Sequence, residues 1–247
     1  MTNGRIIAVA SGKGGVGKTW LAITLAHAMA RAGTRVLLFD GDLGLANVDV
    51  QLGLMPTGDV GEVAAGRQTL EQAVLHHDGG FDILPGRSGS GSLAALDAAL
   101  LERTLAALRQ ATARYQVVVL DLGAGLDRAQ RRMASFADTL LVVATDEPTS
   151  LTDAYAVLKL HAADRHEGDA RVVVNLAATR SAGERTFATL QRACATFLGR
   201  SPRLAGVIRR DDRVRDAIRR QTLLLTRHPA CPAAADVEAT AVFLLTA

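Results

Sequence analysis

A glycine-rich stretch near the N-terminus carries the clearest chemical signal in this sequence. Residues 12–19 read GKGGVGKT and match the pattern G-x-x-x-x-G-K-[ST] between an apolar run and an Ala/Leu-rich segment. Glycines let backbone N–H groups turn toward phosphate oxygens, and the N-terminus of a following helix adds partial positive charge. The alternative is a glycine-rich turn that binds nothing. We predict a nucleotide-phosphate site formed by Gly12, Lys13, Gly14, Gly15, Val16, Gly17, Lys18, Thr19 and Trp20.

Two residues at the end of this stretch have distinct expected roles. The ammonium group of Lys18 is expected to contact the β- and γ-phosphates of the nucleotide, and the hydroxyl of Thr19 is expected to ligate Mg²⁺. The cofactors predicted from the residues are therefore a nucleoside triphosphate or diphosphate together with Mg²⁺.

Three aspartates follow two apolar runs and complete the predicted site. Asp40 ends RVLLFD, Asp42 comes two residues later, and Asp121 ends QVVVLD. We predict that Asp40 and Asp121 belong to the Mg²⁺ site, with Asp121 holding a metal-bound water. We predict that Asp42 orients or deprotonates the attacking water. The alternative for Asp40 and Asp42 is a structural role in a turn or at a helix cap.

The elements that must position these residues alternate regularly along the chain. Several expected strands are continuous apolar runs, which is typical of a parallel sheet covered by helices on both faces. The expected strands span 5–10, 35–40, 81–86, 116–121, 139–145, 171–177 and 204–209, and the clearest expected helices span 19–31, 92–113, 150–163 and 184–198. This rhythm predicts an α/β fold, with a doubly wound, mostly parallel sheet in a single domain over residues 1–247.

Composition narrows the function classes. The 247 residues carry 28 Lys and Arg against 25 Asp and Glu, so net charge alone implies no nucleic-acid partner. Only two cysteines occur, Cys194 and Cys231, and they are far apart, which argues against a structural zinc or iron–sulfur site on one chain. No apolar run approaches the roughly 20 residues needed to cross a bilayer.

Taken together, these residues resemble the MinD/ParA ATPases. A lysine directly after Gly12 matches the deviant Walker A signature of that family. The resemblance extends over nearly the whole chain, and four phrases look most like the flagellar-number regulator branch named FlhG, YlxH or FleN. These phrases are DGDLGLANVDVQLGL (40–54), DLGAG (121–125), EPTSLTDAYAVLKL (147–160) and VRDAIRRQTLLLTRHP (214–229).

The resemblance implies an ATPase that hydrolyses ATP slowly and switches between a monomer and an ATP-sandwich homodimer. It implies that Lys13 crosses the dimer interface to the phosphates of the partner subunit, which gives Lys13 a catalytic role beside Lys18 and Asp42. Neutralising two facing triphosphates with a second cation is physically sensible. It also implies that Asn175 binds the adenine and that the loop with Arg209 and Asp211 flanks it, although Arg209 stands where the family has proline.

Trp20 departs from the family, which places Thr, Ser or Asn there to touch the α-phosphate. Its indole has a single N–H donor and no acceptor. Either this N–H replaces the contact, or the ring packs beside the nucleotide or on the partner subunit. We favour packing.

The implied partners are a second copy of the chain, the flagellar GTPase FlhF and flagellar basal-body proteins. Regulators of this branch stimulate FlhF through an N-terminal extension, whereas only MTNG precedes the first strand, so we do not expect that stimulation. The ending AAADVEATAVFLLTA has two acidic and no basic residues, so we expect it to pack on the domain and not on an anionic membrane. We expect a cytoplasmic protein that is recruited to a cell pole or to the inner membrane surface.

Other classes remain as alternatives. A ParA-type DNA-partitioning ATPase would use a basic surface, and six arginines fall within residues 209–220. Because three aspartates are mixed among them, we interpret this segment as a solvated face with the ion pairs Asp211–Arg215 and Asp216–Arg220. An iron–sulfur carrier or a kinase-like enzyme would need motifs that we do not find. We interpret His76 and His77 as an exposed loop pair.

Overall fold

The protein is described by a computed structural model for residues 4–42, 46–86, 98–125 and 127–246. One eight-stranded sheet forms its centre, with strand order β3-β4-β2-β5-β1-β6-β7-β8, and only the β3–β4 pair is antiparallel. The strands are β1 (Arg5–Ala10), β2 (Val36–Gly41), β3 (Leu75–His77), β4 (Phe81–Leu84), β5 (Val117–Leu122), β6 (Thr139–Ala144), β7 (Asp169–Ala177) and β8 (Arg203–Arg209).

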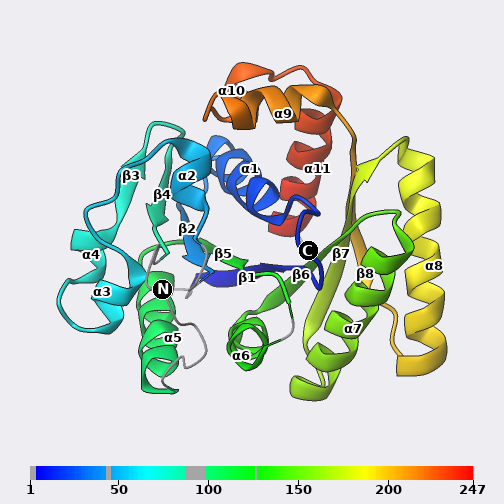
Figure 1. The fold of residues 1–247 in the computed structure, drawn as a ribbon, viewed down its shortest axis with the longest axis horizontal. Helices are drawn as coiled ribbons and strands as arrows, with labels where there is room; N and C mark the ends of the chain where they lie inside the picture. The colour runs from blue at the N-terminus through cyan, green and yellow to red at the C-terminus, as the bar shows by residue number, and fades with distance from the viewer. Residues whose placement is uncertain (1–3, 43–45, 87–97, 126, 247) are drawn as a thin grey trace.

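Helices cover both faces of the sheet (Figure 1). They are α1 (Lys18–Arg31), α2 (Val48–Leu52), α3 (Val60–Ala64), α4 (Leu70–Ala73), α5 (Ala98–Thr112), α6 (Arg128–Phe136), α7 (Pro148–Asp164), α8 (Arg180–Leu198), α9 (Asp212–Arg219), α10 (Leu224–Arg227) and α11 (Pro232–Thr246). The helices α1, α2 and α9–α11 pack on one face of the sheet, and α3–α8 pack on the other.

Alternation along the central strand shows why its sequence is continuously apolar. Ile7 and Val9 belong to the core cluster beneath α1 and α11, whereas Ile6 and Ala8 belong to the cluster on the opposite face. Successive strand residues point to opposite faces, so a strand covered on both sides needs apolar residues at every position. The predicted fold class is therefore confirmed.

The predicted elements agree closely with the observed ones. All seven predicted strands are present, and their ends lie within two residues of the prediction. The predicted helix over 92–113 corresponds to α5, while its residues 92–97 lie outside the described part of the chain. The interpretation of His76 and His77 as a loop pair is wrong. They lie in β3, a strand of three residues that is too short to show a period in the sequence.

The C-terminal segment forms α11, which packs against α1 and β8. Val237, Ala241 and Leu244 are buried there, and Arg31 on α1 forms an ion pair with Glu238 at 3.1 Å. The expectation that this segment packs on the domain is confirmed. Within the described ranges, we find no helix that is both long enough and apolar enough to cross a membrane.

Candidate nucleotide site

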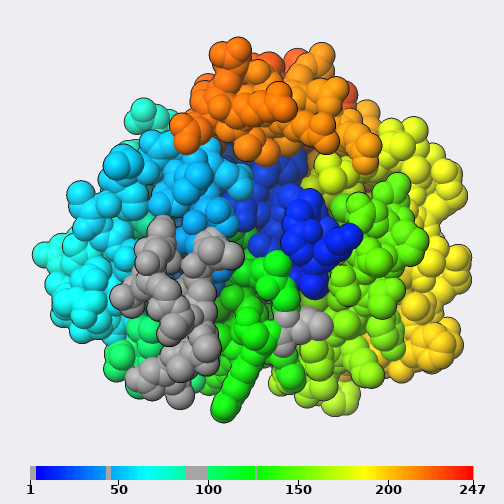
Figure 2. Space-filling view, in the orientation of Figure 1, coloured from blue at the N-terminus to red at the C-terminus, as the bar shows by residue number. Residues whose placement is uncertain are grey.

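The glycine-rich stretch forms the connection between β1 and α1, as the sequence predicts. Figure 2 shows part of this N-terminal segment, in dark blue, at the surface of the drawn face. Gly15 and Gly17 have φ angles of 80° and 85°, which L-residues with a Cβ rarely adopt. A Cβ on Gly17 would also lie 2.6 Å from the side-chain nitrogen of Asn175. Two independent constraints therefore require glycine at position 17.

Lys18 and Asp121 meet inside the molecule, at the start of α1 and near the end of β5. The Lys18 Nζ atom lies 3.7 Å from Oδ1 of Asp121, and both side chains are largely buried. Burial raises the pKa of Asp121, whereas the Lys18 charge and the Thr19 hydroxyl act in the opposite direction. The structure thus brings together the predicted phosphate lysine and two of the predicted metal-site residues.

Asp40 lies beside Asp121, since the two residues are partners in the β2–β5 register. Its carboxylate accepts N–H groups from Asp42, Asn47 and Val48 at 3.1–3.2 Å, so it holds the chain that follows β2. Burial, and next the charge of Asp121, raise the pKa of Asp40 to about 7. The carboxylate of Asp40 is therefore already hydrogen-bonded to three backbone N–H groups. Its role in the metal site stays a prediction.

The acidic pair fits a divalent cation. Oδ1 of Asp121 is buried and accepts no hydrogen bond from any described residue. Across the described ranges, no cluster of three or more His, Cys, Asp or Glu side chains could hold a metal by itself. Mg²⁺ is commonly bound by one or two carboxylates together with phosphate oxygens and waters, so this sparse ligand set suits it.

Asp42 lies next to the Gly-Ala-Gly segment that follows β5. A Cβ placed on Gly123 would be 3.2 Å from the Asp42 carboxylate, and Gly125 donates its N–H to the Ser11 carbonyl at 3.1 Å. The predicted water-positioning aspartate, the segment after Asp121 and the start of the glycine loop are therefore contiguous. The catalytic role of Asp42 remains a prediction.

Asn175 braces the glycine loop from the end of β7. Its Nδ2 donates to the Val16 carbonyl at 2.8 Å, and its Oδ1 accepts the N–H of Leu176 at 2.9 Å. The side chain is buried, and Leu176 has a φ of 58° that the second hydrogen bond supports. One N–H and one lone pair of the amide stay free of these bonds, so the predicted adenine contact is neither shown nor excluded.

Lys13 differs from Lys18, because its side chain lies near the surface and contacts residues at the start of α7. Its Nζ contacts Oε2 of Glu147 at 2.6 Å and the hydroxyl of Thr149 at 3.1 Å, and its side chain is 39% exposed. Glu147 and Thr149 lie at the start of α7, after β6, and β6 is paired with β1. No role was predicted for Glu147 and Thr149, although both fall in the phrase 147–160 that resembles the family.

The sequence matches a known protein family over most of its length. Residues 7–224 match the CobQ/CobB/MinD/ParA nucleotide binding domain. The chain belongs to this family. It is similar to the antiactivator FleN of Pseudomonas aeruginosa, with 38% identity over 96% of this chain and 85% of FleN. It is also similar to the flagellum site-determining protein YlxH of Helicobacter pylori, with 29% identity over 76% of this chain and 63% of YlxH.

Among solved structures, the fold matches the MinC:MinD cell division protein complex of Aquifex aeolicus. The TM-score is 0.81 at 26% identity, over 98% of this chain and 96% of that one. The MinD/ParA proteins of this family are ATPases. The resemblance drawn from the sequence is therefore confirmed, including its placement near FleN and YlxH.

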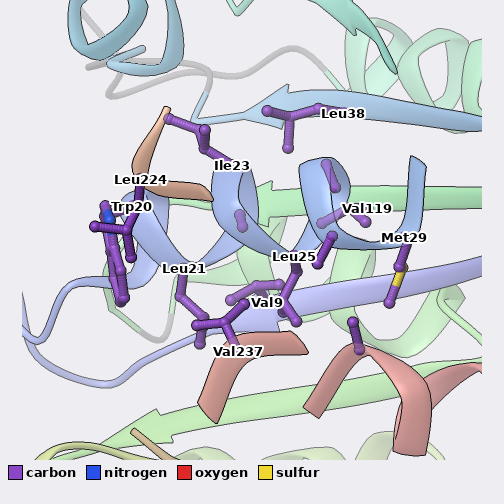
Figure 3. Close-up of a cluster of buried hydrophobic side chains, with 14 of the residues drawn as sticks. Val9, Trp20, Leu21, Ile23, Leu25, Met29, Leu38, Val119, Leu224 and Val237 are labelled. Carbon is purple, nitrogen blue, oxygen red and sulfur yellow. The ribbon is translucent and has the colours of Figure 1, made fainter. Parts of the chain in front are cut away.

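Trp20 stands where the family resemblance led us to expect Thr, Ser or Asn. Figure 3 shows its ring at the N-terminal end of α1, beside Leu224, within the core cluster of this face. The residue is only 7% exposed, and its Nε1 has no hydrogen-bond partner among the described residues. The ring therefore packs in this chain's own core and not on a partner subunit, so that form of the packing prediction is wrong.

The predicted adenine-flanking loop is held by ion pairs and a helix cap. Arg209 binds Asp236 of α11 with two side-chain hydrogen bonds of 2.8 and 2.9 Å and with its backbone N–H. Asp211 caps α9 by accepting the N–H of Arg213. Arg209 thus anchors this loop to α11 where the family has proline, and the base contacts of Arg209 and Asp211 stay predictions.

Proposed function

We propose that this chain is an ATP-driven molecular switch that forms an ATP-sandwich homodimer, hydrolyses ATP slowly, and sets the placement or number of flagella or of another polar structure. The observation that carries the proposal is the division of the two loop lysines. Lys18 is buried against Asp121, whereas Lys13 lies outside against Glu147 and Thr149. One lysine can serve the nucleotide of its own subunit while the other is available to a second subunit.

Within one subunit, each side chain near Asp121 has a defined task. Lys18 binds the β- and γ-phosphates and loses little freedom in doing so, because it is already ordered at Asp121. Thr19 and Asp121 would hold Mg²⁺, which supplies positive charge to the developing phosphate. Asp42 orients the attacking water next to Gly123, and Asp40 fixes Asp42 through its backbone N–H. ATP, ADP and Mg²⁺ are accordingly the proposed cofactors.

Lys13 makes the oligomeric state depend on the nucleotide. In the single chain it is paired with Glu147, so it contributes no free cation to the phosphates of its own loop. An exposed ion pair of this kind is worth little and is easily exchanged for another partner. Two triphosphates facing each other across a dimer would offer a denser negative charge, and Lys13 would then leave Glu147 for the partner's phosphates.

The test compares the removal of Lys13 with the removal of Lys159, a lysine outside the glycine loop. Lys13→Ala should keep nucleotide binding and lose the ATP-dependent dimer in light scattering. Lys159→Ala removes the same charge from an exposed position on α7 and should leave both properties intact. An intact ATP dimer in the Lys13→Ala variant would refute the interface role.

The flagellar part of the proposal rests on the similarity to FleN and YlxH. FlhF and basal-body proteins are the proposed partners, and the proposed location is the cytoplasm with recruitment to a pole or to the inner membrane surface. Deleting the gene should change the number or position of flagella, counted by electron microscopy, and a tagged copy should locate at the pole. Normal flagellation combined with mis-segregated DNA would transfer support to a partitioning role.

One observation favours that partitioning role as a second candidate. Arg210, Arg215 and Arg219 are exposed around α9, and within the described ranges none forms an ion pair. Arg220 is paired with Asp216 at 3.0 Å as predicted, whereas Asp211 pairs with Arg213 and not with Arg215, so that predicted pair is wrong. DNA retention that requires ATP and falls steeply with salt would support this candidate.

A further inference from the structure

A cavity lies between α7 and α8, away from the glycine loop. It has a volume of about 420 Å³, which is within the range of small-molecule pockets. Its apolar walls include Leu158 and Ala162 of α7 and Leu198 of α8. Its polar lining includes His161 of α7, the carboxylates of Glu167 and Asp169, and Arg200 and Arg203 near the start of β8. Nothing in the proposed ATPase mechanism uses these residues.

His161 is the unusual side chain in this cavity. It is 5% exposed, and neither ring nitrogen has a hydrogen-bond partner in the described part of the chain. Burial, and next the charge of Arg165, lower the pKa of His161, so the ring is neutral and offers one donor and one acceptor. A Cβ on Gly168 would lie 2.5 Å from Nε2 of His161, so the absence of a side chain at position 168 makes space for the ring. Buried polar atoms without partners are rare in proteins.

Arg200 supplies a positive charge at the same cavity. Its guanidinium contacts only the Nδ1 of His166 among the described residues and has no carboxylate within ion-pair distance. Arg203, by contrast, is paired with Asp169 at 3.3 Å. The charge of Arg200 also contributes to lowering the pKa of His161, after burial and the charge of Arg165.

We propose that the cavity between α7 and α8 binds a small organic anion. Its carboxylate or phosphate head would accept hydrogen bonds from Arg200 and, once the buried ring turns toward the cavity, from His161. Its apolar body would pack against Leu158, Ala162 and Leu198. A guanidinium and an imidazole N–H are the donors that suit such a head. The apolar walls favour a ligand that also carries a hydrocarbon group, so a bare inorganic ion is a poor ligand for this site.

The same histidine connects this cavity to the nucleotide site. His161 also lines a smaller cavity between α6 and α7, which reaches Gly123 and Gly125 after Asp121. Gly125 is bonded to Ser11 at the start of the glycine loop. A ligand that turns the His161 ring therefore acts on the segment beside Asp42. This coupling to ATP turnover rests on the proposed function, whereas the binding site does not.

Binding is tested on the full, nucleotide-free chain with ¹⁵N-labelled histidine rings. The six histidines give few signals, and His161→Gln identifies the one from His161. Sodium benzoate and phenyl phosphate are titrated separately at constant ionic strength, with benzyl alcohol as the neutral analogue. We expect a saturable shift of the His161 signal with at least one anion and none with the alcohol. The anion that acts identifies the head group as carboxylate or phosphate.

Two variants and one control make the result specific. Arg200→Ala should weaken binding about tenfold or more, the scale of one charged hydrogen bond. Ala162→Trp fills the cavity and should abolish the shift in a chain whose circular dichroism is unchanged. Arg192→Ala removes an exposed arginine from α8 outside the cavity and should bind normally. The site is refuted if neither anion shifts His161, or if both cavity variants bind as the wild type does.

Coupling has its own readout. ATP turnover of the wild type should change about twofold or more when the binding anion saturates the site, whereas Ala162→Trp should show no response. Anion binding with unchanged turnover would overturn the coupling and leave the site standing. A chain that binds the anion but hydrolyses no ATP would instead contradict the proposed function.

Discussion

Asn175 offers the sharpest test of how the glycine loop is held. Its amide joins the Val16 carbonyl to the end of β7 through a buried hydrogen bond and accepts the N–H of Leu176 through a partly buried one. Asn175→Ala leaves this carbonyl and the N–H of Leu176 without partners. A buried polar group left unsatisfied costs about 1–3 kcal/mol, so we expect a total loss of about 3 kcal/mol in the free energy of unfolding. For a chain of this length, that corresponds to roughly 6–12 °C in melting temperature.

The same change should lower the affinity of the chain for every ligand that contacts the loop. If Asn175 acts as a brace, calorimetry of Asn175→Ala should show about a tenfold weaker affinity for ADP and a similar decrease for pyrophosphate, which has no base. Asn175→Asp keeps the acceptor for Leu176 but turns a carboxylate oxygen toward the Val16 carbonyl, so its affinity for both ligands should be lower still.

A surface bond of the same kind is the control. The amide of Gln221 donates to the Val50 carbonyl at 2.8 Å in an exposed position, so Gln221→Ala should change neither stability nor affinity by much. If Asn175→Ala lowered the affinity for ADP alone, its role would be a base contact, and the brace would be disproved. An unchanged melting temperature would disprove it as well.

Three further predictions concern single positions in the site. Lys18→Ala should abolish ADP binding in calorimetry while the circular dichroism spectrum is retained, and measurable binding would contradict its phosphate role. Trp20→Thr should lower the free energy of unfolding by about 3 kcal/mol in denaturant titrations because it empties a core position, and Trp20→Phe should cost clearly less. Because the pKa of Asp40 is raised to about 7, the folded, nucleotide-free chain keeps a proton that the unfolded chain loses near pH 4. Its stability should therefore fall by about 2 kcal/mol between about pH 5 and pH 8, and a fall of the same size in Asp40→Asn would contradict this assignment.

The strands were predictable because burial on both faces leaves a strong mark in the sequence. Runs such as 117–120 are apolar at every position, and their acidic ends mark the sheet edge that carries the candidate site. Asp40 and Asp121 were expected in one Mg²⁺ site, and the strand register makes them direct partners. The short strand β3 has no such mark, because three residues cannot show a period.

Contacts between distant segments could not be predicted in the same way. Glu147 lies 134 residues from Lys13, and only the pairing of β1 with β6 brings them together. The brace from Asn175 to Val16 likewise depends on where β7 ends relative to the loop. For Trp20, the residue type did not reveal that the ring packs in the core that α1 forms with α10 and α11, an arrangement outside the alternatives drawn from the sequence.

The central claim is that ATP, and not ADP, joins two copies of this chain through Lys13. The most direct measurement is the molar mass by light scattering of the wild type, Asp42→Ala and Lys13→Ala, each with Mg·ATP and with Mg·ADP. The single chain has a mass of 25.9 kDa. We predict twice this mass for Asp42→Ala in Mg·ATP, which should trap the dimer, and the single-chain mass for Lys13→Ala in both nucleotides. A mass that is the same in ATP and ADP for Asp42→Ala, or a full ATP dimer of Lys13→Ala, would contradict the account.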